Sequence, residues 1–202
     1  QKQDLRKELG FANDSLVLLG SSTWPGEEEM LLKAAAKLRK EGIDCRLLLV
    51  PRHAERRAHI EELIKDIPHC VRSKSRRAPA GTLAYLADTT GELRTLTQIA
   101  DIAFIGKSLP PNDGGQTPID CAALGVPMVY GPNMSNFRRI CATLEESAAA
   151  IKVKNAESAI AEIERLAKNP ELRKTLAESA KRWHSSNIGA ARRDFEAIEK
   201  FL

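Results

Sequence analysis

Short apolar runs alternate with amphipathic stretches along this chain. Apolar residues dominate the segments Leu16–Leu19, Arg46–Val50 and Ile102–Ile105, and a glycine or proline follows each segment directly. Apolar runs of this length, bounded by turn residues, are typical of strands that are buried on both faces. We therefore predict three buried strands at these positions, the first of them ended by Gly20.

Weaker apolar segments predict further strands. They share β-branched or aromatic residues next to turn-forming residues, and they lie near Cys70–Arg72, Leu83–Leu86, Val126–Tyr130 and Ala149–Val153.

Helical patterns fill the segments between these strands. The clearest runs from about Gly26 to Lys40, with three glutamates at its start and Lys37, Arg39 and Lys40 at its end, as the helix dipole favours. The other predicted helices are Ala54–Asp66, a helix that begins near Glu92, Pro118–Leu124, and most of the chain from Asn136 to Leu202.

Strands that alternate with helices predict a doubly wound, Rossmann-like parallel α/β sheet. With 202 residues, we expect a single domain covering 1–202. Ligands of such sheets bind outside the carboxyl ends of the strands. The loops at 20–26, 51–53, 88–92 and 106–117 each follow a strand or precede a helix. We therefore expect them to meet at one edge of the sheet.

Composition narrows the possible classes of protein. With 43% hydrophobic and 29% charged residues, the chain has the composition of a soluble globular protein. No apolar run approaches the roughly 18 residues that cross a bilayer, and the charged segment at 1–8 predicts neither a signal peptide nor an anchor. Four cysteines without a C-x-x-C pair predict reduced thiols in a cytosolic compartment, with no zinc site.

The charge balance suits an anionic ligand. Lysine and arginine outnumber aspartate and glutamate by 31 to 27, a net charge of +4. This excess is too small for a protein that binds duplex DNA, and 4% aromatic residues offer little for stacking single-stranded bases, so we expect no nucleic acid partner. The basic segment Arg72–Arg77 predicts an exposed loop with a weak affinity for an acidic membrane surface.

A glycine pair carries the clearest chemical signal. Gly114 and Gly115 allow a ligand to approach the backbone N–H groups closely, and Pro118 is suited to the first position of a helix. A helix start behind bare glycines favours phosphate, and Asp120 in the first turn is placed to accept hydrogen bonds from ribose hydroxyls. The alternative is a loop that needs glycine for its own conformation, with Asp120 serving only the helix dipole.

Polar residues in three other loops offer further contacts. Ser22 and Thr23 are candidates for phosphate or sugar binding, with a simple helix cap as the alternative. Arg52 at the end of a strand is suited to bind phosphate or carboxylate, and His53 follows it. Helix capping alone would explain Glu92. The chain has no G-x-S-x-G nucleophile motif and no Walker phosphate-binding loop, and its histidines show no metal-ligand spacing.

Taken in order, these segments resemble a known family, the 3-deoxy-D-manno-octulosonic acid (Kdo) transferases of lipid A biosynthesis. The resemblance covers about Val17 to Leu202 and only the C-terminal half of that family's two-domain enzymes. The motifs that carry it are Ser22-Thr23-x-x-Gly26-Glu27-Glu28, Pro51-Arg52-His53, Thr90-Gly91-Glu92-Leu93, Gly114-Gly115-x-x-Pro118, Ala122-Ala123-Leu124-Gly125-Val126-Pro127, Tyr130-Gly131-Pro132 and Asn136-Phe137.

The resemblance implies the donor-binding domain of a GT-B glycosyltransferase, which holds CMP-Kdo. It further implies inverting transfer to a lipid A precursor at the cytoplasmic face of the bacterial inner membrane, without a metal. The general base and the membrane contact belong to the family's N-terminal half. We therefore expect this chain to be an excised domain that lacks the acceptor half, contains no catalytic residue, and binds the donor without turnover.

The resemblance also implies the residues that contact the donor. They lie in the loops described above and are Ser22, Thr23, Arg52, His53, Gly91, Glu92, Gly114, Gly115, Gln116, Thr117, Asp120 and Asn136.

The chain departs from the family pattern at several of these loops. It has Gln116-Thr117 where the family has His-Asn, Asp120 where the family has Glu, and Trp24 where His is common. The loop from Gly106 to Gly114 is also one residue longer. Two alternatives therefore stay open: another GT-B transferase or a sugar-nucleotide epimerase that uses a UDP-sugar, and a non-catalytic nucleotide-binding domain.

Overall fold

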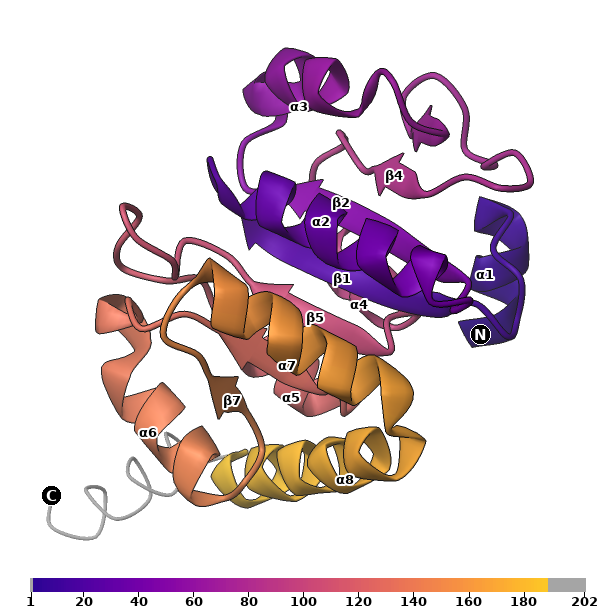
Figure 1. Ribbon diagram of the computed structural model, residues 1–202. Helices are drawn as coiled ribbons and strands as arrows, with labels where there is room; N and C mark the ends of the chain where they lie inside the picture. Colours follow the sequence, from indigo (N-terminus) through magenta and orange to yellow (C-terminus); the bar gives the residue numbers. More distant parts are fainter. Residues whose placement is uncertain (1, 189–202) are drawn as a thin grey trace, which may run out of the picture.

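Seven parallel strands form one sheet in a computed structural model of the chain, which describes residues 2–188 (Figure 1). The strands are β1 (Leu16–Thr23), β2 (Cys45–Pro51), β3 (His69–Val71), β4 (Ala84–Leu86), β5 (Ile102–Ile105), β6 (Met128–Tyr130) and β7 (Ile151–Lys152). They are hydrogen-bonded in the order β3-β4-β2-β1-β5-β6-β7, and every pair is parallel. The predicted doubly wound sheet is therefore confirmed.

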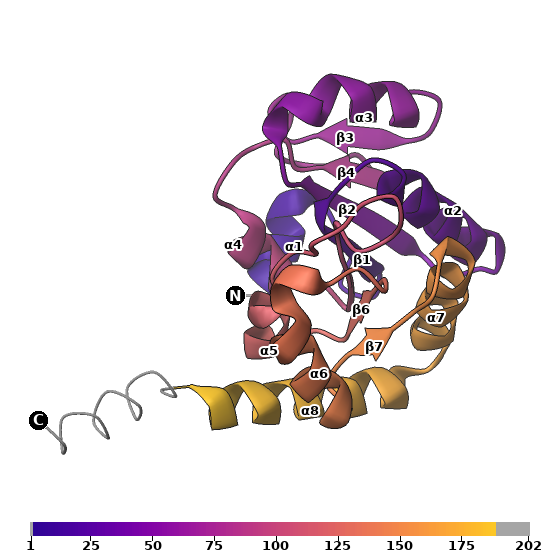
Figure 2. The ribbon, with the colours of Figure 1, turned by 90° about the vertical axis from the view of Figure 1, so that its left-hand side faces the viewer.

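Helices cover both faces of this sheet (Figure 2). They are α1 (Lys2–Leu9), α2 (Glu27–Lys40), α3 (Arg57–Ile64), α4 (Leu93–Thr97), α5 (Ile119–Leu124), α6 (Arg138–Glu146), α7 (Ala156–Lys168) and α8 (Pro170–Asn187). Two short 3-10 turns, Ala54–Arg56 and Ser135–Phe137, lead into α3 and α6. Among residues 2–188, every helix is too short or too polar to span a membrane.

Alternating side chains divide the core into two layers. Val17 and Leu19 of β1 pack with α1, α4, α5 and α6, whereas Leu16 and Leu18 pack with α2, α3 and α7. Side chains of a strand point alternately to the two faces of its sheet, so a continuous apolar run buries both. This explains why the central strands were predictable from short apolar runs.

The first strand is longer than predicted because Gly20 does not end it. β1 continues to Thr23, and a Cβ at Gly20 would lie 2.7 Å from Leu31 Cδ1 and 2.8 Å from Thr23 Cγ2. Glycine is therefore needed for close packing of the strand against α2. The turn itself comes later, where Ser22 has a φ of 54° and Gly26 a φ of 89°.

The other predicted elements are mostly confirmed, with shifted ends. The strand at Ile102–Ile105 matches, and the segment predicted as helix 54–66 begins as a 3-10 turn before α3. The helical region after Asn136 divides into α6, α7 and α8, interrupted by β7, and its predicted end at 189–202 lies outside the described residues. We did not predict α1, because Leu5 and Leu9 are its only apolar residues.

The chain changes direction in the sheet between its two central strands. From β1 it proceeds to β2 on one side, and it later returns to β5 on the other side. The loops after β1 and β5 therefore leave the carboxyl edge in opposite directions. Ligands of open α/β sheets bind in the crevice at such a switch point.

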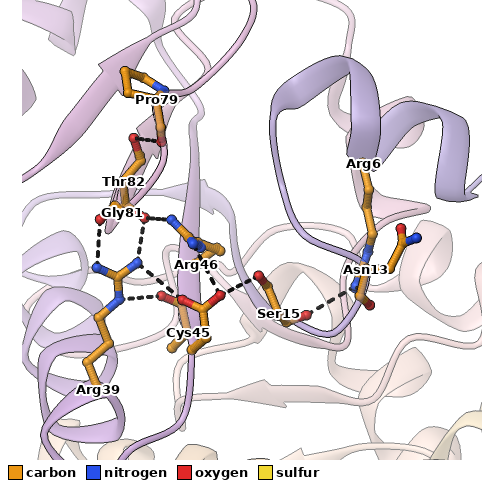
Figure 3. A network of polar contacts seen from close by, with 10 residues as sticks. Arg6, Asn13, Ser15, Arg39, Cys45, Arg46, Pro79, Gly81 and Thr82 are labelled. Carbon is orange, nitrogen blue, oxygen red and sulfur yellow. Dashed lines mark hydrogen bonds and ion pairs between the residues drawn. The ribbon is translucent and has the colours of Figure 1, made fainter.

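A polar network closes the opposite, amino-terminal edge (Figure 3). The buried guanidinium of Arg6 donates to Ser15 O at 3.1 Å, and Ser15 Oγ donates to Asp44 Oδ2 at 2.6 Å. Asp44 also accepts from Arg46, whose other nitrogen donates to Thr82 O at 2.5 Å. These contacts hold α1 and the starts of β1 and β2 together. They lie at the edge of the sheet opposite the loops that form the candidate site.

Arg6 and Lys2 bind the same carboxylate from different environments, which makes them a matched pair. Arg6 contacts Asp101 at 2.6 Å and is 4% exposed, whereas Lys2 contacts it at 3.0 Å and is 46% exposed. We predict that Arg6→Met lowers the free energy of unfolding by about 3 kcal/mol, because the buried carbonyls of Ser15 and Ile99 lose their Arg6 donor and Asp101 loses its buried cation. Lys2→Met should cost less than about 1 kcal/mol in the same urea titration. Equal losses would contradict a burial-dependent role for Arg6.

Candidate functional site

The loops after β1, β2, β5 and β6 meet at the carboxyl edge of the sheet, on the left in Figure 1. Direct contacts connect them: the ring of His53 lies edge-on to that of Trp24 at 5.4 Å, Lys107 Nζ lies 4.6 Å from the centre of the Trp24 ring, and Asn136 N–H donates to Gly114 O at 3.0 Å. The predicted convergence is therefore confirmed for the loops at 20–26, 51–53 and 106–117, and the loop after β6, which was not predicted to join them, lies there as well.

Glu27 connects the two loops at the switch point. Its carboxylate, 1% exposed, accepts backbone N–H groups from Trp24, Lys107 and Ser108 at 2.9 Å each, and from Leu109 at 3.2 Å. Burial raises the pKa of Glu27, and the four N–H groups oppose that rise. The carboxylate therefore determines the backbone conformation of both loops.

Glu28, the next residue, attaches the loop after β2 to the start of α2. Its carboxylate is 1% exposed and binds Arg56 through both oxygens, at 2.6 and 3.1 Å. Arg56 also donates to Thr23 O at 3.1 Å. Two consecutive glutamates at the start of α2 thus hold the loops on either side of β1.

Glu92 and Asp88 connect the loops after β3 and β4. Arg72, 6% exposed, donates to both oxygens of Glu92 at 2.6 and 2.5 Å, and this pairing lowers the pKa of Glu92 to about 2. Asp88 accepts from Ser73 N–H at 2.9 Å and from Ser73 Oγ at 2.5 Å. Glu92, a predicted donor contact, therefore already has a partner within the protein.

The basic segment 72–77 is only in part the exposed loop that we predicted. Arg72 is buried against Glu92, whereas the side chain of Lys74 pairs with Glu61 at 3.0 Å and that of Arg76 with Glu8 at 3.4 Å. Carboxylates on neighbouring elements thus neutralise three of its cations, which reduces its attraction for an acidic surface.

The glycine pair adopts a conformation that side chains rarely adopt. Gly114 has a φ of 105° and Gly115 a φ of 71°. A Cβ on Gly114 would lie 2.7 Å from Asn136 Nδ2, and one on Gly115 would lie 2.4 Å from Met134 Sδ. The N–H of Gly115 donates to Lys107 O at 2.9 Å, so it is already used within the loop. The loop therefore needs both glycines for its own shape.

The start of α5 follows this loop. Gln116 and Thr117 are half-buried, and Thr117 Oγ1 accepts from the N–H of Ile119, the first residue of the helix. Pro118 is the N-cap of this helix, so the helix begins at Ile119, one residue later than predicted. The Asp120 carboxylate lies 3.7 Å from the exposed guanidinium of Arg94 on α4, and 30% of its side chain is exposed.

The remaining predicted residues differ in how accessible they are. Ser22 and Thr23 are buried, and Thr23 Oγ1 has no hydrogen-bond partner among the described residues. Arg52, His53 and Gly91 are exposed. Arg52 and His53 therefore present charge and hydrogen-bonding capacity to the edge of the sheet, whereas Ser22 and Thr23 shape the turn that leads into it.

Sequence reasoning did not identify Lys107 and Trp24 as residues of this site, nor their contact with each other. Lys107 follows a strand-ending glycine inside a predicted special loop, which was a usable signal. Trp24 was noted only as a departure from a family pattern. Among residues 2–188, no three histidine, cysteine, aspartate or glutamate side chains are grouped to hold a metal ion.

The chain resembles known proteins over nearly all of its length. The family model described as "Glycosyl transferases group 1" matches residues 2–183. A 3-deoxy-D-manno-octulosonic acid transferase from Haemophilus influenzae is 31% identical over 95% of this chain and 45% of its own length. The corresponding protein from Rickettsia bellii is 27% identical over 100% of this chain and 47% of its own length. The chain thus spans about half the length of these curated relatives.

Solved structures show the same fold. The C-terminal CMP-Kdo binding domain of WaaA from Acinetobacter baumannii is similar with a TM-score of 0.83 and 27% identity, covering 91% of this chain and 95% of that domain. A glycosyltransferase from Rickettsia africae is similar with a TM-score of 0.63 and 20% identity, covering 94% of this chain and 48% of the other.

Glu27 offers a first test of how the site is held. We predict that Glu27→Gln lowers the free energy of unfolding by about 3 kcal/mol, because an amide has one acceptor oxygen for four N–H groups and turns its own NH₂ toward them. Glu29→Gln changes a carboxylate in the same first turn without these bonds and should cost less than about 1 kcal/mol. Urea unfolding followed by circular dichroism measures both; similar losses would contradict the bridging role.

Glu92 offers a test that depends on pH. Its pKa is about 2 in the folded protein and near 4.5 when unfolded, so its ionic contribution is present above pH 4.5 and is lost as the pH falls through 2. We predict that Glu92→Gln costs about 2 kcal/mol at pH 7 and progressively less from pH 4.5 downward. The exposed Glu62→Gln serves as control in urea titrations at several pH values. A loss independent of pH would contradict the ion pair.

Proposed function

The chain belongs to the Glycosyl transferases group 1 family, and from this premise we propose that it is the donor-binding domain of a Kdo transferase. Its seven-stranded parallel sheet is the Rossmann-like fold of a GT-B glycosyltransferase domain. The substrate that we propose is CMP-Kdo, bound at the carboxyl edge between the loops after β1, β2, β5 and β6.

One observation carries this proposal above the alternatives. The similar Acinetobacter baumannii structure is itself a C-terminal CMP-Kdo binding domain, and chain and domain cover each other over 91% and 95% of their lengths. The glycine loop and the switch point between β1 and β5 lie at the edge where such a sheet binds nucleotides. The similarity supports CMP-Kdo as the donor, and the loop geometry supports the position of the site.

The donor chemistry agrees with the charges at this edge. CMP-Kdo carries a phosphodiester and a sugar carboxylate, both anionic. Arg52 is exposed and has no side-chain partner among the described residues, so its guanidinium is available to bind either anion through two nitrogens. We assign the ribose hydroxyls to Asp120, whose contact with Arg94 at 3.7 Å is loose enough to exchange.

In the proposed reaction, the domain stabilises the departing CMP. Negative charge grows on the phosphate as the bond to the sugar breaks, and fixed backbone dipoles and guanidinium groups stabilise that charge without reorganising. We propose that the reaction inverts the anomeric centre and needs no metal. The base that activates the acceptor would come from the other half of the longer protein, so this domain would bind the donor without turnover.

The acceptor and the cellular location follow from the same proposal. A Kdo transferase acts on a lipid A precursor, so the whole enzyme would contact the cytoplasmic face of the bacterial inner membrane in lipopolysaccharide biosynthesis. The paired cations of segment 72–77 make this domain a weak candidate for that contact. We place the membrane contact in the other half of the enzyme.

Gln116 and Thr117 depart from the Kdo transferase pattern, and this departure supports a second candidate function with a different donor. Neither side chain carries a charge, unlike a histidine that can be protonated at this position. A GT-B transferase or epimerase specific for a UDP-sugar would share the sheet and the glycine loop. Base preference separates the two candidates, and a non-catalytic nucleotide-binding domain would differ in having no catalytic partner domain.

Calorimetric titration with CMP, UMP and UDP tests the proposal. We predict that CMP binds most tightly and that Asp120→Ala and Arg52→Ala each weaken it about tenfold, because each removes one charged hydrogen-bonding group. The controls Asp66→Ala and Arg77→Ala change exposed residues of the same types elsewhere and should leave the affinity unchanged. Tighter binding of UDP would favour the second candidate. No binding at millimolar nucleotide would contradict a domain that binds the donor by itself.

A further inference from the structure

Lys107 stands where the two switch-point loops meet. Its backbone N–H donates to Glu27 and its carbonyl accepts from Gly115, each at 2.9 Å. Its ammonium group lies 4.6 Å from the centre of the Trp24 ring and 3.6 Å from the point that a Cβ on Gly114 would occupy. The side chain is therefore directed across the glycine loop and lies against the aromatic ring.

The backbone of Lys107 is held in an unfavourable conformation. Its φ is 58°, in the left-handed region that L-residues with a side chain avoid. Glycine would adopt this conformation without cost, so a lysine there lowers the stability of the loop. Such strain is found mainly at functional sites, where the surrounding contacts maintain it.

The charge of Lys107 is not neutralised within the described protein. Two other cations at this edge have carboxylate partners: Arg56 binds Glu28, and Arg72 binds Glu92. For Lys107, the structure shows the Trp24 ring and no carboxylate among residues 2–188. A cation–π contact positions an ammonium group and leaves its charge in place.

The indole beneath the ammonium has its own unsatisfied group. Trp24 Nε1 is buried and has no hydrogen-bond partner among the described residues. His53 lies edge-on to the same ring at 5.4 Å. The loops after β1, β2 and β5 thus contribute an indole, an imidazole and an ammonium group to one small region beside the glycine pair.

We propose that Lys107 binds the anionic oxygens of the donor between Trp24 and Gly114, as the principal fixed cation of this site. The proposal rests on the donor-binding function proposed above and adds a residue to it. The preferred ligand group is the phosphate; the sugar carboxylate offers the same oxygen chemistry. Trp24 acts as a positioning residue, because its ring holds the ammonium group over the loop.

The fluorescence of Trp24 reports directly on ligand binding in this region. The chain has two tryptophans, and Trp183→Phe leaves Trp24 as the only one. In that background, we would titrate CMP, UMP, cytidine, pyrophosphate and free Kdo into the parent protein and its Lys107 variants. Cytidine lacks the phosphate, pyrophosphate lacks the base, and free Kdo supplies the carboxylate alone.

We expect Lys107→Gln to weaken CMP and pyrophosphate about tenfold and to leave cytidine unchanged, because only the charged contact is lost. Lys107→Arg should keep most of the affinity. Lys107→Gly should behave as the glutamine variant does, and glycine adopts a φ of 58° without strain, so a folding defect cannot explain its loss. The control Lys33→Gln makes the same change of net charge at an exposed position on α2.

The outcomes separate the possible explanations. A loss confined to free Kdo would support Lys107 as the anion-binding cation with the sugar carboxylate as its ligand. Unchanged binding of CMP, pyrophosphate and Kdo by Lys107→Gln would overturn the proposal, as would an equal loss of cytidine or no response of the parent protein to any of these probes. A parent that prefers UMP to CMP, with the effect on pyrophosphate intact, would instead overturn the Kdo transferase function and leave Lys107 as the anion site.

Discussion

The buried carboxylate of Glu27 is the contact on which the candidate site depends. Two loops leave the sheet in opposite directions at the switch point, and each has backbone N–H groups that the sheet cannot satisfy. Glu27 accepts four of them from the start of α2, where the helix dipole favours a negative charge. Without this acceptor, buried donors would lack partners, and Trp24 and Lys107 would lose the backbone geometry that places their side chains against each other.

The other carboxylates of this edge act in the same way on the neighbouring loops. Glu28 and Glu92 each bind an arginine through both oxygens, and Asp88 holds the loop after β3. Their combined effect on charge is selective, because they neutralise the cations that hold the loops together. Arg52 and Lys107 keep an uncompensated positive charge in the described structure. Although the net charge of the chain is only +4, these two cations attract an anion to the region beside the glycine pair.

Much of the fold was accessible from the sequence because buried parallel strands have a strong local signal. Ile102–Ile105 is buried on both faces, so its apolar run matched the strand itself. Where a residue serves a distant contact, local reasoning failed. Gly20 resembles a strand terminator, yet its hydrogen atom makes room for Leu31 of α2. The α1 helix has few apolar residues, and it is held largely by Arg6, whose partners Ile99 and Asp101 lie more than ninety positions along the chain.

The sequence by itself determined the class of sheet, the edge at which its special loops meet, and the candidate residues Arg52, Gly114 and Asp120. These follow from periodicity and from the rule that parallel strands end on one side. Only the tertiary structure decided which polar groups are already paired and which are available: Glu92 is bound by Arg72, the Gly115 N–H is bound by Lys107, and the ammonium group of Lys107 rests on Trp24. Such pairings join residues from different loops, so they depend on strand order and register, which no local stretch of sequence specifies.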